Sequence, residues 1–285
     1  MKAKVLVFSN FKGGAGKTST GALVAWELAH RGNKVLVVDF DSQQNMTDFF
    51  LRTKAELENQ SSIETDNTVL TAIYENKSLK EVAIPITSNL DLVPTSMYFQ
   101  KEYQSYLEVN YPLNIDSQEK ARKAELNRVK SLKPKIDKVR PLYDYIFLDV
   151  PPSISSPNDT VFYACDDVII VLQTQERSFS GAQNFIKYLQ DFIIDDMDGD
   201  VGVLGVIPVL SKKNGQVDET ILADATSLFD ESNMFKTRIY LQERIKRMDM
   251  TGITDHDIWD KRVHKTFAAV TDEIIQRLKD EEKDE

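Results

Sequence analysis

The chain has 285 residues, and its 35 Lys and Arg against 45 Asp and Glu give a formal net charge of −10. The 41% of hydrophobic and 28% of charged residues indicate a globular protein with a sizeable core and exclude a disordered chain. No run of eighteen apolar residues occurs and there is one cysteine, which argues against a membrane span, a disulfide framework and a cysteine metal cluster. We expect a cytoplasmic protein, in which any nucleic-acid contact is local because the net charge is negative.

The N-terminal residues predict a βαβ unit. Apolar, β-branched runs at residues 4–9 and 34–39 predict two buried strands. Apolar residues at helical spacing between them predict a helix over residues 18–31, ended by Gly32. A strand, a helix and a strand in this order imply a parallel sheet.

The rest of the chain continues this alternation. Further strands are predicted at residues 90–94, 145–150, 167–173 and 201–210. Helices are predicted at residues 69–74, 79–82, 179–193, 217–229 and 263–278, with an amphipathic helix at 118–139 that is interrupted near Pro134. Residues 53–67 are polar and indicate a surface excursion, residues 98–106 are aromatic-rich without a clear pattern, and the acidic residues 279–285 predict a frayed tail.

These elements predict one α/β domain over residues 1–285, with a mostly parallel, twisted sheet between two layers of helices. The sequence shows no internal repeat and no linker that would mark a second domain.

A glycine-rich loop joins the first strand to the first helix. Glycines let the backbone fold around phosphate oxygens, and the N-terminus of a helix adds partial positive charge. A lysine and a threonine after the glycines suit terminal phosphates and Mg²⁺, respectively. The alternative is a glycine-rich turn without a ligand, which the Lys17-Thr18 pair in this context disfavours. The predicted nucleotide contacts are Gly13, Gly14, Ala15, Gly16, Lys17, Thr18 and Ser19.

A further lysine, Lys12, begins this loop and gives it the form Lys-Gly-Gly-x-Gly-Lys-Thr. Two more motifs follow predicted strands, Asp-Phe-Asp-Ser-Gln-Gln-Asn at 39–45 and Asp-Val-Pro-Pro-Ser at 149–153. With them the chain resembles the ParA/MinD family of deviant Walker A ATPases, whose fold is the three-layer P-loop NTPase fold. The resemblance is fullest over residues 4–47 and 144–206, and Ser42 replaces the family's usual proline.

The resemblance implies an ATP- and Mg²⁺-dependent mechanism. Family members bind ATP as a face-to-face homodimer in which the lysine matching Lys12 touches the partner's phosphates. It implies catalytic roles for Lys12, for Lys17 on the phosphates and for Asp41, which matches the residue that orients the attacking water. It also implies that Thr18 and Asp149 hold Mg²⁺, with Asp39 supporting the metal or Lys17. For the three aspartates the alternative is a helix cap or turn residue.

Among branches of the family, the sequence favours a short ParA-type partition ATPase. The single cysteine excludes the iron protein of nitrogenase, and the acidic end after residue 278 disfavours a MinD-like membrane helix. Such partition proteins are weak ATPases that bind DNA without sequence preference as ATP dimers, at the nucleoid, until a ParB-like centromere-binding partner triggers hydrolysis. The alternatives are a MinD-like positioning ATPase at the membrane and an ATP-dependent small-molecule ligase of the dethiobiotin synthase type.

Two further site predictions concern the base of the nucleotide and DNA. Residues 208–211, after a predicted strand, lie where this fold would hold adenine. A DNA surface is predicted at five cations within twelve positions: Lys236, Arg238, Arg244, Lys246 and Arg247. The alternatives are a solvated helix face paired with Glu243 and Asp249, and a rival basic surface at residues 120–140.

Overall fold

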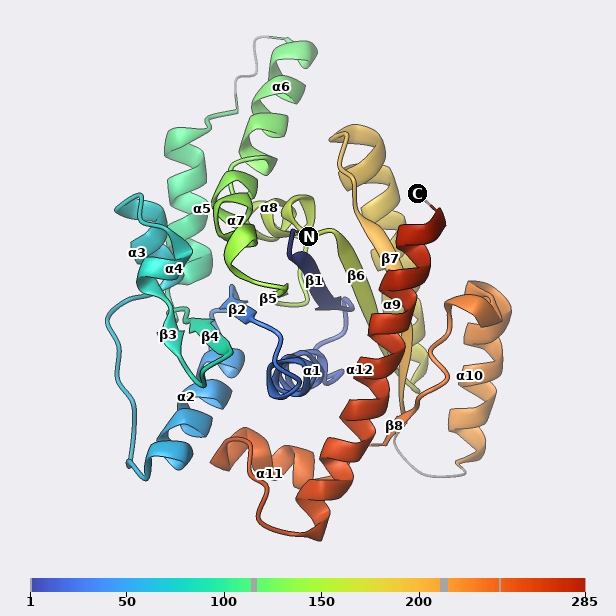
Figure 1. The fold of residues 1–285 in the computed structure, drawn as a ribbon. Helices are drawn as coiled ribbons and strands as arrows, with labels where there is room; N and C mark the ends of the chain where they lie inside the picture. Colours follow the sequence, from blue (N-terminus) through green and yellow to red (C-terminus); the bar gives the residue numbers. More distant parts are fainter. Residues whose placement is uncertain (1, 114–116, 211–214, 241, 285) are drawn as a thin grey trace.

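The computed structural model describes residues 2–113, 117–210, 215–240 and 242–284 (Figure 1). Its strands form one sheet in the order β3-β4-β2-β5-β1-β6-β7-β8. They are β1 (Lys4–Ser9), β2 (Val35–Asp39), β3 (Ile84–Pro85), β4 (Leu90–Val93), β5 (Tyr145–Asp149), β6 (Asp167–Gln173), β7 (Gly202–Leu210) and β8 (Ile239–Tyr240). Among these described strands, β3 is antiparallel to β4 and the other pairings are parallel.

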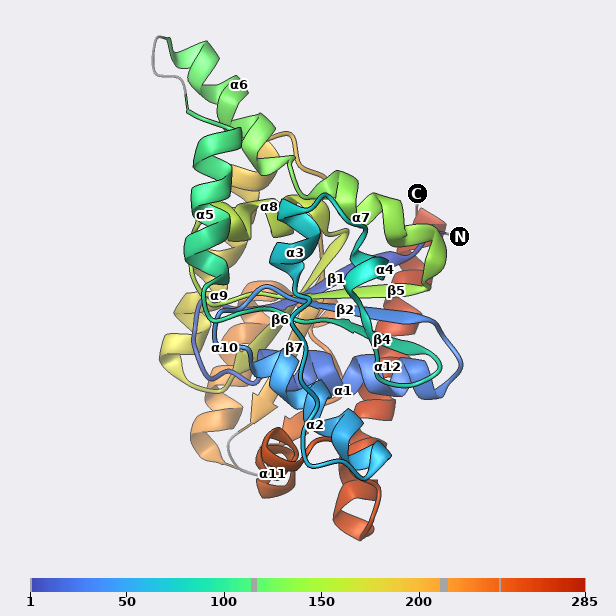
Figure 2. The ribbon, with the colours of Figure 1, turned by 90° about the vertical axis from the view of Figure 1, so that its left-hand side faces the viewer.

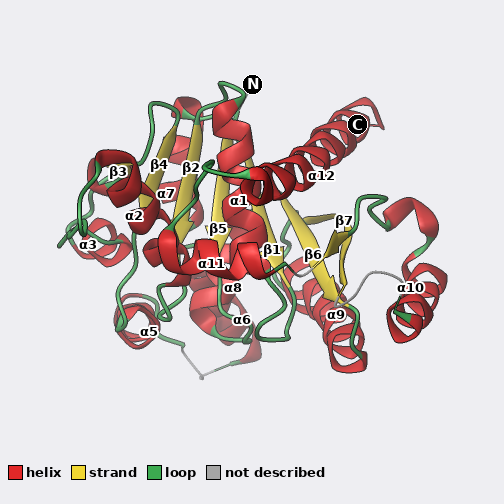
Figure 3. Ribbon diagram, turned by 90° about the horizontal axis from the view of Figure 1, so that it is seen from below, coloured by secondary structure: helices red, strands yellow, loops and turns green. Residues whose placement is uncertain are grey.

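Helices cover both faces of the sheet (Figures 2 and 3). One face carries α1 (Lys17–His30), α2 (Asn45–Glu58), α11 (Glu243–Thr251) and α12 (Ile258–Asp284). The other carries α3 (Val69–Tyr74), α4 (Leu79–Val82), α5 (Phe99–Asn110), α7 (Lys133–Val139), α8 (Ser156–Ala164) and α9 (Glu176–Tyr188). Helix α6 (Gln118–Val129) packs on α8, and α10 (Gln216–Phe229) packs on α9 and β7. The predicted three-layer α/β fold is confirmed.

Side-chain alternation along the strands separates the two cores. In β1, Val5 and Val7 belong to one hydrophobic cluster, whereas Leu6 and Phe8 belong to the other. Both faces of a central parallel strand are buried, so its sequence is a continuous apolar run. This explains why the six longer strands are recognisable in the sequence, with bounds within one residue of those predicted.

Several predictions for the connecting segments were wrong. Residues 53–58 belong to α2, where Met46, Phe49, Phe50 and Thr53 form a buried stripe at helical spacing. The aromatic segment at 98–106 lies mostly in α5. Every fourth residue of this helix is buried, namely Phe99, Tyr103 and Leu107. By contrast, the interruption predicted near Pro134 within residues 118–139 is confirmed: the segment forms two helices, and Pro134 lies in the first turn of the second.

The C-terminal segments also differ from the predictions. Helices α8 and α11 were not predicted, and the helix predicted over 179–193 continues from α9 into a π-helical segment, Leu189–Asp196. Helix α12 extends through Asp284, so residues 279–284 of the predicted frayed tail are helical. Across the described ranges, no helix combines the length and apolar character needed to cross a bilayer.

The parallel strands β1, β2, β5, β6 and β7 all end at one edge of the sheet, because parallel neighbours share a direction. The loops that follow β1, β2 and β5 contain the three sequence motifs. The fold therefore gathers these motifs at a single edge.

Candidate nucleotide-binding site

The glycine-rich loop leads directly into the N-terminus of α1. Gly14 and Gly16 have φ values of 72° and 83°, in the left-handed region that glycine adopts without steric cost. Gly16 is also the N-cap of α1, so no side chain caps the first N–H groups of this helix. These uncapped donors and the helix dipole favour the binding of an anion at this loop.

Lys17 is the buried cation of this loop. Its Nζ lies 3.1 Å from the carbonyl oxygen of Lys12, so the side chain folds back over the loop. Burial lowers the pKa of Lys17, while the charges of Asp149 and Asp41 act in the opposite direction. A phosphate beside this ammonium would stabilise its charged form.

Thr18 and Asp149 are brought together across the sheet. The Thr18 hydroxyl donates to Asp149 Oδ2 at 2.9 Å, and Asp149 is paired in register with Asp39 on β2. Burial and then the charge of Asp39 raise the pKa of Asp149 well above its usual range. Two adjacent buried carboxyl groups and a hydroxyl form an oxygen-rich site of the kind that suits Mg²⁺.

The described residues include no group of three or more His, Cys, Asp or Glu side chains arranged to hold a metal. Mg²⁺ at a nucleotide needs no such group, because waters and phosphate oxygens supply most of its ligands. The Thr18 and Asp149 oxygens therefore fit the predicted metal contacts.

Asp39 and Asp41 differ in what their oxygens contact. Asp39 is fully buried and accepts from the backbone N–H of Asp41 and from both the N–H and the hydroxyl of Thr47. Burial raises its pKa to about 7. Asp39 thus fixes the start of α2, in line with the capping alternative, and its metal role stays a prediction.

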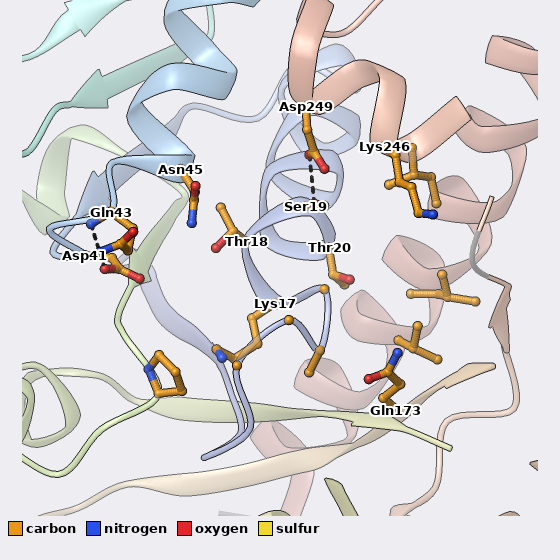
Figure 4. Close-up of a pocket in the computed structure, with 18 of the residues that line it drawn as sticks. Lys17, Thr18, Ser19, Thr20, Asp41, Gln43, Asn45, Gln173, Lys246 and Asp249 are labelled. Atoms are coloured by element: carbon orange, nitrogen blue, oxygen red, sulfur yellow. Dashed lines mark hydrogen bonds between the residues drawn. The ribbon is translucent and has the colours of Figure 1, made fainter. Parts of the chain in front are cut away.

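Asp41 lines the cavity in front of the phosphate loop, as Figure 4 shows. Its Oδ1 accepts from the backbone N–H of Gln43 at 2.9 Å, which orients the carboxylate. Burial raises the pKa of Asp41, and the charge of Lys17 opposes that shift. This position suits a group that orients a water molecule.

Lys12 is held by its own chain. Its Nζ donates to Oε1 of Gln173, the last residue of β6, at 2.7 Å and to Oε1 of Gln175, the N-cap of α9. Gln173 itself lines the cavity. The structure thus places the Lys12 ammonium beside the cavity wall that β6 forms.

The cavity has a volume of about 630 Å³ and a polar and an apolar end. The polar end is formed by the phosphate loop and Asp41, and the apolar end by Val209, Ile239 and Ile245, with Gln242 beside them. Of the segment 208–211 predicted to hold adenine, Val209 lines this apolar end, whereas Ser211 lies outside the described residues.

Helix α11 contributes residues that the sequence analysis did not assign to the nucleotide site. Asp249 accepts from the Ser19 hydroxyl at 3.0 Å, and Lys246 also lines the cavity (Figure 4). Burial raises the pKa of Asp249. No motif marks α11, so the sequence carried no signal for these contacts. Gln43 and Asn45, by contrast, stand in the second motif and could have been found from it.

The five cations predicted to contact DNA occupy different settings. Arg244 forms ion pairs with Asp257 and with the fully buried Asp260, which leaves its side chain 15% exposed. The other four cations, Lys236, Arg238, Lys246 and Arg247, are exposed. Two of them form surface ion pairs, Arg238 with Glu219 at 2.9 Å and Lys246 with Glu243 at 3.6 Å. Arg244 therefore stabilises the start of α12, as expected for a paired helix residue.

Part of the rival basic segment is also structural. Arg128 donates to the carbonyl oxygen of Tyr111, Lys135 to that of Ala72, and Arg140 to Asp166 and the carbonyl oxygen of Ala3. These contacts leave fewer exposed cations there than the sequence suggests.

Comparison with known proteins supports the assignment of the fold and motifs. A family described as an AAA domain matches residues 3–199. The sporulation initiation inhibitor protein Soj of Bacillus subtilis is 23% identical over 250 residues, covering 87% of this chain and 88% of Soj. The virulence plasmid ParA family protein pGP5-D of Chlamydia psittaci is 24% identical and covers 98% of this chain and 97% of its own length.

A solved structure of similar fold is that of a Cyanothece McdA variant in complex with ATP. It superposes with a TM-score of 0.74 at 19% identity and covers 96% of each chain. At this identity the likeness concerns the fold.

Proposed function

This chain belongs to the AAA-domain family and, within it, to the ParA-type partition ATPases, and from this premise we propose that it is an ATP-driven DNA-partition switch. In this proposal ATP binding forms a homodimer that holds DNA without sequence preference. A ParB-like centromere-binding partner stimulates slow hydrolysis, and hydrolysis releases the DNA. The observation that carries the proposal is the Thr18–Asp149 hydrogen bond, which joins the phosphate loop to the strand-end carboxylate at 2.9 Å.

The cavity supports ATP as the ligand. The triphosphate would lie on the phosphate loop and Lys17, and the adenine against Val209, Ile239 and Ile245, with Gln242 as a hydrogen-bonding side chain. Thr18 and Asp149 would hold Mg²⁺, which supplies positive charge at the phosphates when bound. Asp41, oriented by the Gln43 N–H, would position the attacking water.

Lys12 would supply the second cation at the reacting phosphates. In the single chain its ammonium is bound by Gln173 and Gln175. To act on a partner's phosphates it must leave these two amide oxygens. We infer that release of Lys12 accompanies formation of the ATP dimer, and that this step contributes to the slowness of the switch.

Co-sedimentation tests the proposal. With a non-hydrolysable ATP analogue, the protein should dimerise and pellet with unrelated DNA duplexes but not with anionic liposomes. The Lys17→Ala variant should lose nucleotide binding, and with it dimerisation and DNA binding, because the phosphates lose their buried cation. A matched control is Lys34→Ala, an exposed lysine just before β2 and thus at the opposite edge of the sheet, which should behave as the wild type.

Two other outcomes would contradict the partition role. ATP-dependent binding to liposomes instead of DNA would indicate a MinD-like positioning ATPase. ATP consumption only in the presence of a small carboxylic substrate would indicate a ligase of the dethiobiotin synthase type.

A further inference from the structure

The side chain of Asn10, between β1 and the glycine-rich loop, is completely buried. Its Nδ2 donates to the carbonyl oxygen of Val171 at 3.0 Å and to the carbonyl and hydroxyl oxygens of Ser178 at 3.2 and 3.1 Å. Its Oδ1 accepts from the backbone N–H of Lys12 at 3.1 Å. Carbonyl oxygens cannot donate, so the amide nitrogen must face Val171 and Ser178, and the oxygen must face Lys12.

Ser178 extends this contact to the end of β6. Its hydroxyl also accepts from the backbone N–H of Gln173 at 3.1 Å. The side chain of the same Gln173 binds the Lys12 ammonium at 2.7 Å. One buried hydrogen-bonded group therefore fixes both the backbone of Lys12 and the residue that holds its side chain.

Gly181, in the first half of α9, lies against the same amide. A Cβ atom at this position would come within 2.7 Å of Asn10 Oδ1, closer than real Cβ contacts allow, and 3.6 Å from the Lys12 nitrogen. Any side chain at position 181 would push the Asn10 oxygen away from the Lys12 N–H. Glycine here is required by the close approach of α9 to the loop.

We propose that Asn10, Ser178 and Gly181 are positioning residues that set the location of Lys12, so that α9 controls the first residue of the phosphate loop. Neither Ser178 nor Gly181 lines the cavity, and both are separated from Lys12 by more than half of the chain. The holding of Lys12 is a property of the single chain. Its consequence for hydrolysis rests on the proposed function, in which Lys12 acts on the phosphates.

The first experiment uses Gly181→Ala. Alanine is the better helix former by about 1 kcal/mol, so a loss of helix propensity does not account for any defect. The rate of acetylation of Lys12 by acetic anhydride, followed by mass spectrometry on the nucleotide-free protein, should rise severalfold because a displaced Lys12 backbone moves the amine away from Gln173 and Gln175. If ATP is hydrolysed, kcat should fall about tenfold or more while the Kd for ATP changes less than twofold, because the displaced group serves the reaction rather than binding.

Two controls show whether the effect passes through Asn10. Gln183→Ala, on an exposed position of α9, should leave both the labelling rate and kcat unchanged. In an Asn10→Ala background, Gly181→Ala should have no further effect on Lys12 labelling, since the oxygen that it displaces is absent. Ser178→Ala, which removes two hydrogen bonds without adding bulk, should also accelerate Lys12 labelling and serves if the Gly181 variant does not fold.

The results separate this inference from the proposed function. If Lys12 labelling and kcat in folded Gly181→Ala and Ser178→Ala variants equal those of Gln183→Ala, the positioning role is wrong. The positioning role is also wrong if Gly181→Ala accelerates Lys12 labelling by the same factor in the wild-type and in the Asn10→Ala background. Faster labelling in a protein whose wild type hydrolyses no ATP would support the positioning of Lys12 and contradict the proposed function.

Discussion

Three aspartates gather at the carboxyl edge of the sheet, and their donors distinguish them. Asp39 accepts three hydrogen bonds, one from the Asp41 N–H and two from the N–H and hydroxyl of Thr47 in α2. Asp149 accepts from the Thr18 hydroxyl. Asp41 is held by one backbone N–H and lines the cavity. Burial raises the pKa of all three. Of the three, the cavity-lining Asp41 is the residue best placed to contact water at a bound nucleotide.

We therefore predict that Asp41→Ala binds ATP and dimerises but hydrolyses ATP at least about 100-fold more slowly, the usual loss for a group that positions or deprotonates a nucleophile. Steady-state phosphate release and the lifetime of the DNA complex measure this, and the complex should persist. Asp48→Asn is the matched control, because Asp48 lines the same cavity in a surface ion pair with Arg52. Unchanged hydrolysis in Asp41→Ala would remove it from the reaction.

Asp159, on α8, provides a prediction about pH. Burial raises its pKa to about 6, and its Oδ1 accepts from the Tyr188 hydroxyl. A raised carboxyl pKa means that the folded chain keeps a proton that the unfolded chain releases. This contribution to the free energy of unfolding is fully present below the unfolded pKa and is lost as pH rises through about 6.

Asp159→Asn keeps the hydrogen bond and cannot ionise. Between pH 5 and 7 the wild type should lose about 1 kcal/mol more of unfolding free energy than this variant. Urea denaturation of both proteins at the two pH values measures the difference. Parallel pH profiles would show that Asp159 titrates normally in the folded protein.

Helix α11 forms part of the cavity wall and is attached to α2 by a close backbone contact. Gly252 ends α11 with φ 78°, and its N–H donates to the Met248 carbonyl oxygen. A Cβ atom there would come within 2.4 Å of the Thr53 nitrogen on α2, while Thr53 Oγ1 accepts from the Ile253 N–H at 2.9 Å. The position of α11 over the nucleotide cavity thus depends on this junction.

Gly252→Ala should destabilise the protein by about 2–4 kcal/mol, because alanine meets both backbone strain and a clash with backbone atoms. It should also weaken binding of a fluorescent ATP analogue, since α11 carries Ile245, Lys246 and Asp249 at the cavity. Gly32→Ala is the control: its φ is 89°, but a Cβ there has nothing within 4 Å. That variant should lose only about 1 kcal/mol and bind the analogue normally. Equal losses in the two variants would contradict the role of the α11–α2 junction.

The molecule as a whole carries a net charge of −10, so a DNA-binding surface must concentrate its cations. Arg247 and the 54% exposed Trp259 line one surface cavity, and the Arg262 guanidinium lies over the Trp259 ring at 4.5 Å. We name these three residues the α11–α12 surface. Of the five predicted cations it contains Arg247, and the ion-paired Arg244 lines the same cavity.

Arg247→Glu with Arg262→Glu should lower the affinity of the ATP-bound dimer for unrelated duplexes equally and leave the dimer intact. If each arginine neutralises one phosphate, the slope of log K against log salt should become shallower by about 2 per protomer. The control makes the same charge change on the rival segment, with the exposed Lys123 and Lys130 replaced by Glu. Normal DNA binding by the first variant and weak binding by the second would move the interface to α6.

Local patterns determined much of this protein from the sequence alone. The six longer strands were found because each buried parallel strand is an apolar run by itself. Short sequence motifs identified the phosphate loop, Thr18 and Asp149. That these residues lie close together followed from the parallel strands, which end at one edge of the sheet. Helix α2 was missed although its buried stripe is regular, since the polar residues between were interpreted as a surface segment.

The tertiary structure alone decided which distant residues meet. The sequence orders β1 before β2, yet β1 pairs with β5 and β6, because strand order depends on how the helices pack on both faces. Asp249 reaches Ser19 across 230 positions, and Ser178 reaches Asn10 across 168. Arg244 became an ion-pair partner of Asp260 rather than a free cation. Such contacts have no local period or motif, since they arise only when separate elements pack against one another.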